Sequence, residues 1–213
     1  MTITLQIDNK KIKVAEGTIL LEACLQNDIY IPNLCYLEGM DHPPASCRLC
    51  FVEIEGDVHP APSCAVRVSD DMRVRTDTPR IRRLQISALQ LLLSVHKVDC
   101  RNCPANRNCA LQDMAKFLNT ALKAKRLDRF IKDIEVDPHH PFLDYYPNRC
   151  VLCGRCVYVC RHQQKQTELT FAKRGFDTVI GFFGNPQATP PSCDVCRACV
   201  EVCPVAALLL PKA

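Results

Sequence analysis

Two short segments with the same cysteine spacing constrain this chain more than any other feature. They are CVLCGRCVYVC (150–160) and CDVCRACVEVC (193–203), and they align at all four of their cysteines. One tetrahedral zinc ion cannot easily take four thiolates from so short a run, and zinc motifs usually place two CxxC pairs well apart. The repeat therefore favours polynuclear metal centres over a pair of structural zinc sites.

The repeated pattern is C-x2-C-x2-C-x3-C, with Pro204 after the last cysteine. It resembles the two-cluster [4Fe–4S] ferredoxins over roughly residues 140–213, a family in which the fourth cysteine of each run ligates the other cluster. Arg161 stands where simple ferredoxins often carry proline, a departure that concerns the local turn and not the ligands. The resemblance implies one cluster on Cys150, Cys153, Cys156 and Cys203, and a second on Cys193, Cys196, Cys199 and Cys160.

The N-terminal region holds four further cysteines, Cys35, Cys47, Cys50 and Cys64, with the spacing C-x11-C-x2-C-x13-C. Plant-type [2Fe–2S] ferredoxins use C-x4-C-x2-C and a distant fourth cysteine. The first gap is longer here, but the order of hairpin, helix and ligand loop is similar. With CRLCFVEIEG (47–56), the region resembles the β-grasp domain of respiratory complex I's large peripheral subunit and its hydrogenase relatives. That resemblance implies a [2Fe–2S] cluster; one zinc ion is the alternative, which the spacing fits poorly.

The stretch HKVDCRNCPANRNCALQ (96–112) combines one histidine with three cysteines, His96, Cys100, Cys103 and Cys109. On spacing alone a Cys3His zinc site and an iron–sulfur cluster are equally good interpretations. The position of this stretch between the two cysteine-rich regions favours a cluster. It also resembles the histidine-ligated [4Fe–4S] motif of the same complex I and hydrogenase families, which implies a third [4Fe–4S] cluster with histidine as its fourth ligand.

The number of ligands fits this interpretation. Four clusters need fifteen cysteines and His96, and Cys24 alone of the 16 cysteines is left over. Cys24 lies in LLEACLQ among apolar neighbours, so we interpret it as a small buried hydrophobic residue. The other histidines have no partner pattern, and we expect them in loops or at the surface; they are His42, His59, His139, His140 and His162.

The coarse pattern predicts an α+β chain. Strands are expected at 2–7, 11–14, 51–55 and 72–76, and a helix capped by Thr18 in the segment 19–28. Asp77-Thr78-Pro79 predicts the start of a helix that reaches His96, a second helix spans 110–127, and 167–182 form an inserted hairpin. The predicted domains are a β-grasp [2Fe–2S] domain at 1–77, a helical His-ligated domain at 78–123, a linker at 124–139 and a two-cluster ferredoxin-like domain at 140–213.

Composition excludes several classes of function. The formal charge of +4 is spread out, so nucleic-acid binding has no support. The N-terminus lacks the apolar region of a secretory signal, and the apolar runs are too short to span a bilayer. We therefore expect a soluble cytoplasmic protein without membrane insertion. In such a reducing compartment, dense cysteines usually bind metal and do not form disulfides. No nucleotide-binding or hydrolase motif is present, so we expect no active site of its own.

Along essentially the whole chain, the order of the three cysteine regions resembles three related families. These are the N-terminal region of complex I's large peripheral subunit, the accessory region of multi-cluster [FeFe]-hydrogenases, and the electron-transfer subunit of NAD-linked hydrogenases and formate dehydrogenases. The chain stops at Ala213, before any hydrogen-cluster or molybdopterin domain, so we expect a separate subunit.

The resemblance implies a non-catalytic electron relay between two partners. One is a flavin-containing NAD(P)H-oxidoreductase subunit, and the other is the catalytic subunit of a hydrogenase, a formate dehydrogenase or a low-potential or bifurcating reductase. A free multi-cluster ferredoxin and a zinc-bound structural module are the alternatives. Seven arginines beside or between the ligands are expected to offset cluster charge, although simple solvation also accounts for any one of them; they are Arg48, Arg101, Arg107, Arg149, Arg155, Arg161 and Arg197.

Overall fold

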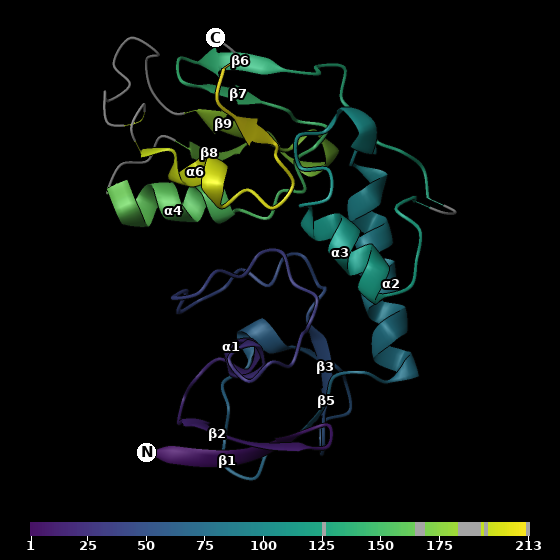
Figure 1. Cartoon of the computed structure of the whole chain (residues 1–213), viewed down its shortest axis with the longest axis vertical. Helices are drawn as coiled ribbons and strands as arrows, with labels where there is room; N and C mark the ends of the chain where they lie inside the picture. The colour runs from purple at the N-terminus through teal and green to yellow at the C-terminus, as the bar shows by residue number, and fades with distance from the viewer. Residues whose placement is uncertain (125–126, 165–168, 183–192, 194–195, 212–213) are drawn as a thin grey trace. The chain divides into compact units, whose positions relative to one another are not determined.

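The computed structural model describes residues 1–124, 127–164, 169–182, 193 and 196–211. It divides the chain into two compact units. The first comprises Met1–Leu89 with Phe117–Thr120, and the second Gln90–Lys116 with Ala121–Ala213. Helices and strands occur in both units (Figure 1), which confirms the expected mixed α and β class.

The sheet of the first unit has five strands in the order β2-β1-β5-β3-β4. β1 pairs with β5 in parallel, and every other pairing in this sheet is antiparallel. The buried residues of β1 and β2 alternate with half-buried or exposed ones, as the period-two pattern predicts. The four predicted strands are confirmed, with bounds β1 Thr2–Ile7, β2 Lys10–Ala15, β3 Phe51–Ile54 and β5 Arg73–Arg75. The short edge strand β4 (Ala61–Pro62) was not predicted.

Helix α1 (Leu20–Leu25) contributes four buried residues to the core of the first unit. Leu20, Leu21 and Cys24 have no exposed surface and belong to one hydrophobic cluster with the inward residues of β1 and β2. The prediction that Thr18 caps this helix is wrong. The Thr18 hydroxyl donates instead to the carbonyl of Ala15 at 2.7 Å, which closes the turn after β2, and the cap position is occupied by Ile19.

Helix α2 (Pro79–Ser94) begins where the sequence predicts. Thr78 Oγ1 accepts the backbone N–H of Ile81 at 3.2 Å, a side-chain cap of the first turn. Helix α3 (Ala110–Phe117) is shorter than the predicted 110–127. Asn119 adopts a left-handed backbone with a φ of 50°, and asparagine tolerates this conformation better than most residues, so the helix ends there. Residues 125–126 of the predicted helix lie outside the described residues.

Among its described residues, the second unit contains two small sheets and the short helices α4 and α6, in addition to most of α3 and the end of α2. One sheet has the order β10-β7-β6, and β8 pairs with β9 as the predicted inserted hairpin, apart from residues 167–168, which lie outside the described residues. The predicted linker differs from the structure at its end, because β6 begins at Asp137. The bounds are β6 Asp137–His140, β7 Leu143–Tyr145, α4 Arg155–Gln164, β8 Leu169–Ala172, β9 Val179–Phe182, α6 Ala198–Glu201 and β10 Leu208–Leu209.

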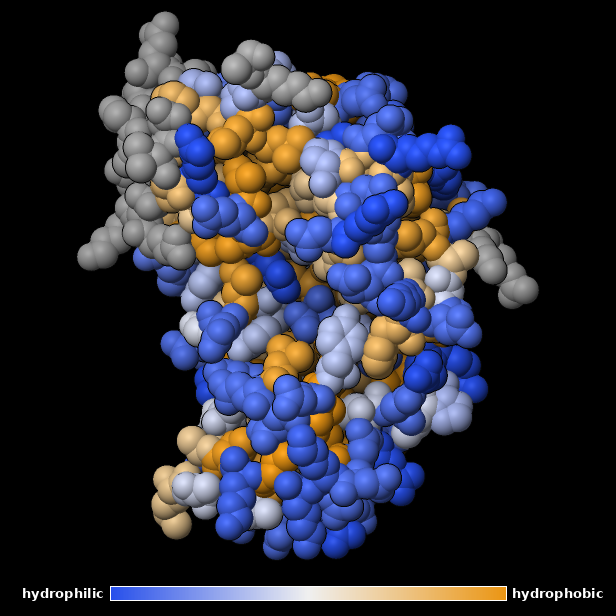
Figure 2. All heavy atoms as spheres, in the orientation of Figure 1, coloured by the Kyte–Doolittle hydropathy of each residue, from blue (hydrophilic) through white to orange (hydrophobic). Residues whose placement is uncertain are grey.

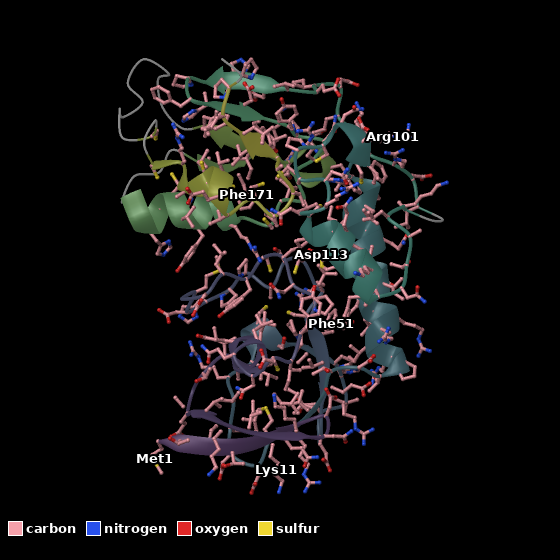
Figure 3. All side chains as sticks on the ribbon, viewed as in Figure 1. Met1, Lys11, Phe51, Arg101, Asp113 and Phe171 are labelled. Carbon is pink, nitrogen blue, oxygen red and sulfur yellow. The ribbon has the colours of Figure 1, made fainter. Side chains whose placement is uncertain are left out.

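A glycine sets the backbone inside the first cysteine run. Gly154 has a φ of +78°, and a Cβ at this position would lie 3.3 Å from the ring of Phe171 in β8 (labelled in Figure 3). At the equivalent position of the second run, Arg197 adopts the same left-handed region with a φ of 50°. Both runs therefore use the same backbone turn between their second and third cysteines.

Hydrophilic side chains cover much of the face drawn in Figure 2. Within the part of the chain that the structure describes, no helix has both the length and the apolar character needed to cross a bilayer.

Candidate metal centres

The predicted metal ligands form four groups along the chain. The first group, Cys35, Cys47, Cys50 and Cys64, lies in the first unit. Its members come from the loop after α1, from the turn before β3, and from the 3-10 helix η1 (Ser63–Ala65). All four side chains are buried, and the sulfurs of Cys35 and Cys47 are 3.4 Å apart. The thiol of Cys64 also lies within hydrogen-bonding range of the sulfurs of Cys35 and Cys50, so the predicted members are neighbours.

The thiols of this first group share protons. The thiols of Cys47 and Cys64 donate to the sulfur of Cys35 and lower its pKa, while their own pKa values rise for the same reason. The Cys64 thiol also lowers the pKa of Cys50 to about 7. The sulfurs of Cys35 and Cys50 therefore favour the thiolate form. Neighbouring thiolates are ligands that both iron–sulfur clusters and zinc use.

The second group surrounds a cavity in the second unit. Its lining includes His96, Cys100, Cys103 and Cys109, the four predicted ligands. Cys109 directly precedes α3. Burial raises the pKa of its thiol, and the first backbone N–H groups of the helix partly oppose this rise. His96 is 9% exposed, and burial lowers its pKa, so the imidazole is neutral at pH 7.

The hydrogen bond of His96 fixes its tautomer. Its Nδ1 lies 2.9 Å from the backbone carbonyl of Arg149. A carbonyl oxygen only accepts, so Nδ1 carries the proton of the neutral ring. Nε2 is then unprotonated, and its lone pair is available as a metal ligand. This arrangement, in which one ring nitrogen donates to the protein and the other is left for a metal, is general for ligating histidines.

The third group combines both cysteine runs. The charges of Cys150, Cys153 and Cys203 each raise the pKa of Cys156, after the larger effect of burial, so the four predicted members lie near one another. The Tyr145 hydroxyl donates to the sulfur of Cys150, which also accepts the N–H of Leu152 at 3.4 Å.

A backbone donor reaches the member of this group that comes from the second run. The sulfur of Cys203 accepts the N–H of Ala207 at 3.1 Å. Donors directed at sulfur stabilise thiolate, as cluster ligation requires.

The fourth group surrounds a separate cavity of the second unit. Its lining includes Cys160, Cys193, Cys196 and Cys199, so the fourth cysteine of the first run joins the first three cysteines of the second. Burial raises the pKa of Cys199 to about 12, and the charges of Cys160 and Cys196 contribute in the same direction.

His140 lies in this fourth cavity, which corrects the expectation that it is a loop or surface residue. It ends β6, is 4% exposed, and lines the cavity together with the cysteines. Its Nδ1 accepts the N–H of Phe142 at 3.1 Å, so the proton of the neutral ring lies on Nε2. No sequence signal pointed to this position, because His140 is far from the cysteines of this group along the chain. The pairing of β6 with β7 positions its ring at the cavity.

The leftover cysteine lies where we expected it. Cys24 has no exposed surface, and burial raises the pKa of its thiol to about 12. No disulfide joins the cysteines that the structure describes. Within the same residues, no group of three or more His, Cys, Asp or Glu side chains is arranged to hold a metal ion, so the ligand sets stay predictions.

Three family models match consecutive regions of the chain. The model described as a 2Fe-2S iron-sulfur cluster binding domain matches residues 1–79. The NADH-ubiquinone oxidoreductase-G iron-sulfur binding region matches residues 85–121. The ferredoxin-like domain of NADH-quinone oxidoreductase subunit 3 matches residues 140–209. The chain therefore contains 2Fe-2S and 4Fe-4S binding domains, one for each cysteine region.

Relatives and a solved structure agree with these matches. The chain is 38% identical to the G 2 subunit of NADH-quinone oxidoreductase from Rhizobium meliloti (strain 1021), over 97% of this chain and 24% of the relative. It is 34% identical to NADP-reducing hydrogenase subunit HndD of Solidesulfovibrio fructosivorans, over 97% of this chain and 36% of the relative. The chain thus spans about a quarter to a third of the length of these curated relatives.

One structural neighbour is a chain in the crystal structure of an NAD+-reducing [NiFe]-hydrogenase in the H2-reduced state. The TM-score is 0.84 at 29% identity, over 99% of this chain and 88% of that chain. The fold, the three matched regions and these relatives lead to one conclusion: the chain belongs to the family of iron–sulfur domains found in NADH-quinone oxidoreductase G and in NAD-reducing hydrogenases.

Proposed function

We propose that this chain is a non-catalytic electron relay with one [2Fe–2S] and three [4Fe–4S] clusters. The observation that carries the proposal is that predicted ligands line shared cavities: His96, Cys100, Cys103 and Cys109 line one, and Cys160, Cys193, Cys196 and Cys199 line another. Cys24, the cysteine without a predicted role, is fully buried in helix α1. The proposed ligands are Cys35, Cys47, Cys50 and Cys64; His96, Cys100, Cys103 and Cys109; Cys150, Cys153, Cys156 and Cys203; and Cys193, Cys196, Cys199 and Cys160.

The donors around the sulfurs support clusters as the occupants. A bound iron–sulfur cluster supplies reversible one-electron transfer, and its potential depends on hydrogen bonds to sulfur and on local charge. In this chain, the Tyr145 hydroxyl and the N–H groups of Leu152 and Ala207 are directed at cysteine sulfurs. These groups stabilise the thiolates, hold them in place and reduce the negative charge on the sulfurs.

Ligation by His96 is supported by its fixed tautomer. The ring is neutral and its Nδ1–H is bonded to the Arg149 carbonyl, so the nitrogen left for a metal is Nε2. The same arrangement suits zinc, and the family match to an iron-sulfur binding region favours the cluster.

The names of the relatives support a place for this chain in a complex of several subunits. Subunits of an NADP-reducing hydrogenase, of NADH-quinone oxidoreductases and of an NADPH-Fe(3+) oxidoreductase are among them. We propose a flavin-containing NAD(P)H-oxidising subunit on one side and a catalytic subunit of the hydrogenase, formate dehydrogenase or low-potential reductase type on the other. A reducing compartment such as the cytoplasm suits the many thiols.

The test is anaerobic purification followed by iron and sulfide analysis and EPR after dithionite reduction. One [2Fe–2S] and three [4Fe–4S] clusters correspond to about fourteen iron atoms per chain. Cys24→Ala is the matched control, because it removes a cysteine and is expected to leave the iron content unchanged. Colourless protein with zinc and no sulfide would contradict the proposal. Co-purification with a flavoprotein supports a relay subunit, whereas an isolated single chain on gel filtration indicates a free ferredoxin.

A further inference from the structure

Arg149 contacts the histidine-containing cavity through both its backbone and its side chain. Its carbonyl accepts the Nδ1–H of His96 at 2.9 Å, and the residue lines the cavity of His96, Cys100, Cys103 and Cys109. It also directly precedes Cys150, the first member of the third group. One residue therefore connects two proposed centres within the second unit.

The guanidinium of Arg149 has a buried donor that is not satisfied. Its Nη1 atom is buried and has no hydrogen-bond partner among the described residues. Within the same part of the chain, no ion pair between Arg149 and a carboxylate is found; the nearby Glu135 is paired with Lys97 at 2.6 Å. A buried cationic donor without an acceptor is costly, so its retention indicates an anionic or acceptor group in the cavity that it lines.

The segment that carries Arg149 is held firmly. Its guanidinium lies 4.0 Å from the centre of the Tyr146 ring, and its N–H donates to the Tyr146 carbonyl at 3.0 Å. The buried side chain of Asn148 accepts the backbone N–H of Lys132 and donates to its carbonyl. The backbone carbonyl of Asn148 accepts the N–H of Lys97 at 2.7 Å. Both the carbonyl and the guanidinium are therefore fixed relative to the cavity.

We infer that Arg149 is a positioning and potential-setting residue of the His96 centre, an inference that rests on the proposed function. Its carbonyl holds the imidazole so that Nε2 is the free ligand, and its guanidinium donates to the anionic cluster that the cysteines and His96 hold. A cation beside the cluster stabilises the more negative, reduced state, so Arg149 raises the midpoint potential of this centre.

The test is a potentiometric titration of the whole chain, followed by EPR, for Arg149→Met and Arg149→Lys. Neither substitution removes the backbone carbonyl, so iron content is expected to stay at the wild-type value. For Arg149→Met we expect about a tenfold fall in the equilibrium constant for reduction of the His96 centre, which is 59 mV for one electron. Arg149→Lys keeps the charge and loses the planar donors, so its potential is expected to lie between those of the wild type and Arg149→Met.

Arg101→Met is the matched control. Arg101 stands next to the proposed ligand Cys100 but is exposed (labelled in Figure 3), so water and salt screen its charge. Its loss is expected to shift the His96 centre far less than the loss of Arg149. The [2Fe–2S] signal, from ligands in the other unit, serves as an internal reference and should not move.

Three outcomes overturn the inference. The first is an unchanged potential of the His96 centre in Arg149→Met with full iron content. The second is a shift no larger than that of Arg101→Met. The third is loss of the His96 cluster in both Arg149 variants, which would make the side chain purely structural. Absence of iron in the wild type would instead contradict the proposed function and would be seen before any variant is made.

Discussion

The two halves of the cysteine repeat have the same spacing but different surroundings. The group that begins at Cys150 receives the Tyr145 hydroxyl and two backbone N–H groups, of Leu152 and Ala207. The cavity of the Cys193 group is instead lined by a buried neutral histidine, His140. Equal spacing therefore creates similar ligand sets, while the neighbouring strands decide which donors the sulfurs meet. If clusters bind, the two centres should differ in potential despite their matching sequences.

Loss of a whole cluster is the greatest change we expect, and it tests whether the fourth cysteines cross between the runs. Cys203→Ala should remove the cluster of the Cys150 group, and Cys160→Ala should remove that of the Cys193 group. Each variant should lose about four iron atoms, as expected for one [4Fe–4S] cluster. Iron analysis and EPR measure the loss and identify the missing signal. If Cys203→Ala instead removes the signal that Cys199→Ala removes, the assignment of Cys203 and Cys160 is reversed.

A smaller change is expected when the histidine centre is converted to match the two all-cysteine groups. His96→Cys adds a thiolate, which makes the centre more negative and therefore harder to reduce. Redox titration should show the potential of that centre moving downward, with the centres of the repeat unchanged. The absence of a shift in a variant that retains its iron would mean that His96 is not a ligand.

The Tyr145 hydroxyl and the His140 ring, which distinguish the two groups, can be removed separately. Tyr145→Phe deletes the hydroxyl that donates to Cys150, and its loss should lower the equilibrium constant for reduction of that centre about fivefold, since a hydrogen bond contributes about 1 kcal/mol. His140→Phe keeps an aromatic ring and deletes the Nε2–H, so it should affect the Cys193 centre alone. Titration of each variant compares the two shifts; a shift in the same centre for both would show that the donors are not specific to one group.

The mildest change concerns the shared left-handed turn. Gly154→Ala places a Cβ 3.3 Å from the Phe171 ring in a backbone with a φ of +78°, and should lower the free energy of unfolding by about 1–2 kcal/mol. Arg197→Gly relieves the same strain in the second run and should raise the free energy of unfolding by up to about 1 kcal/mol. Denaturant unfolding followed by circular dichroism measures both. Equal destabilisation by the two substitutions would show that the turns are not equivalent.

Much of the fold was predictable because its signals are local. The alternating residues of β1 and β2 and the Thr78 cap of α2 each depend on neighbours a few positions away, and both predictions are confirmed. Two errors have different local causes. Thr18 donates to Ala15 instead of capping α1, and Asn119 ends α3 through a left-handed backbone that the helical pattern did not show.

The candidate ligands could be identified from the order of residues along the chain. Two or three residues between cysteines limit how far the sulfurs can separate, so the short spacings identify part of each group before any folding is known. The gaps of 11 and 13 residues in the first group and the exchange of Cys160 and Cys203 between the runs came from the family resemblance. The surroundings of those sulfurs emerged only once the chain was folded. The Arg149 carbonyl bonded to His96 lies 53 residues away along the chain, and His140 joins the Cys193 group through the β6–β7 pairing. Such contacts depend on how distant segments pack against one another, which cysteine spacing alone does not specify.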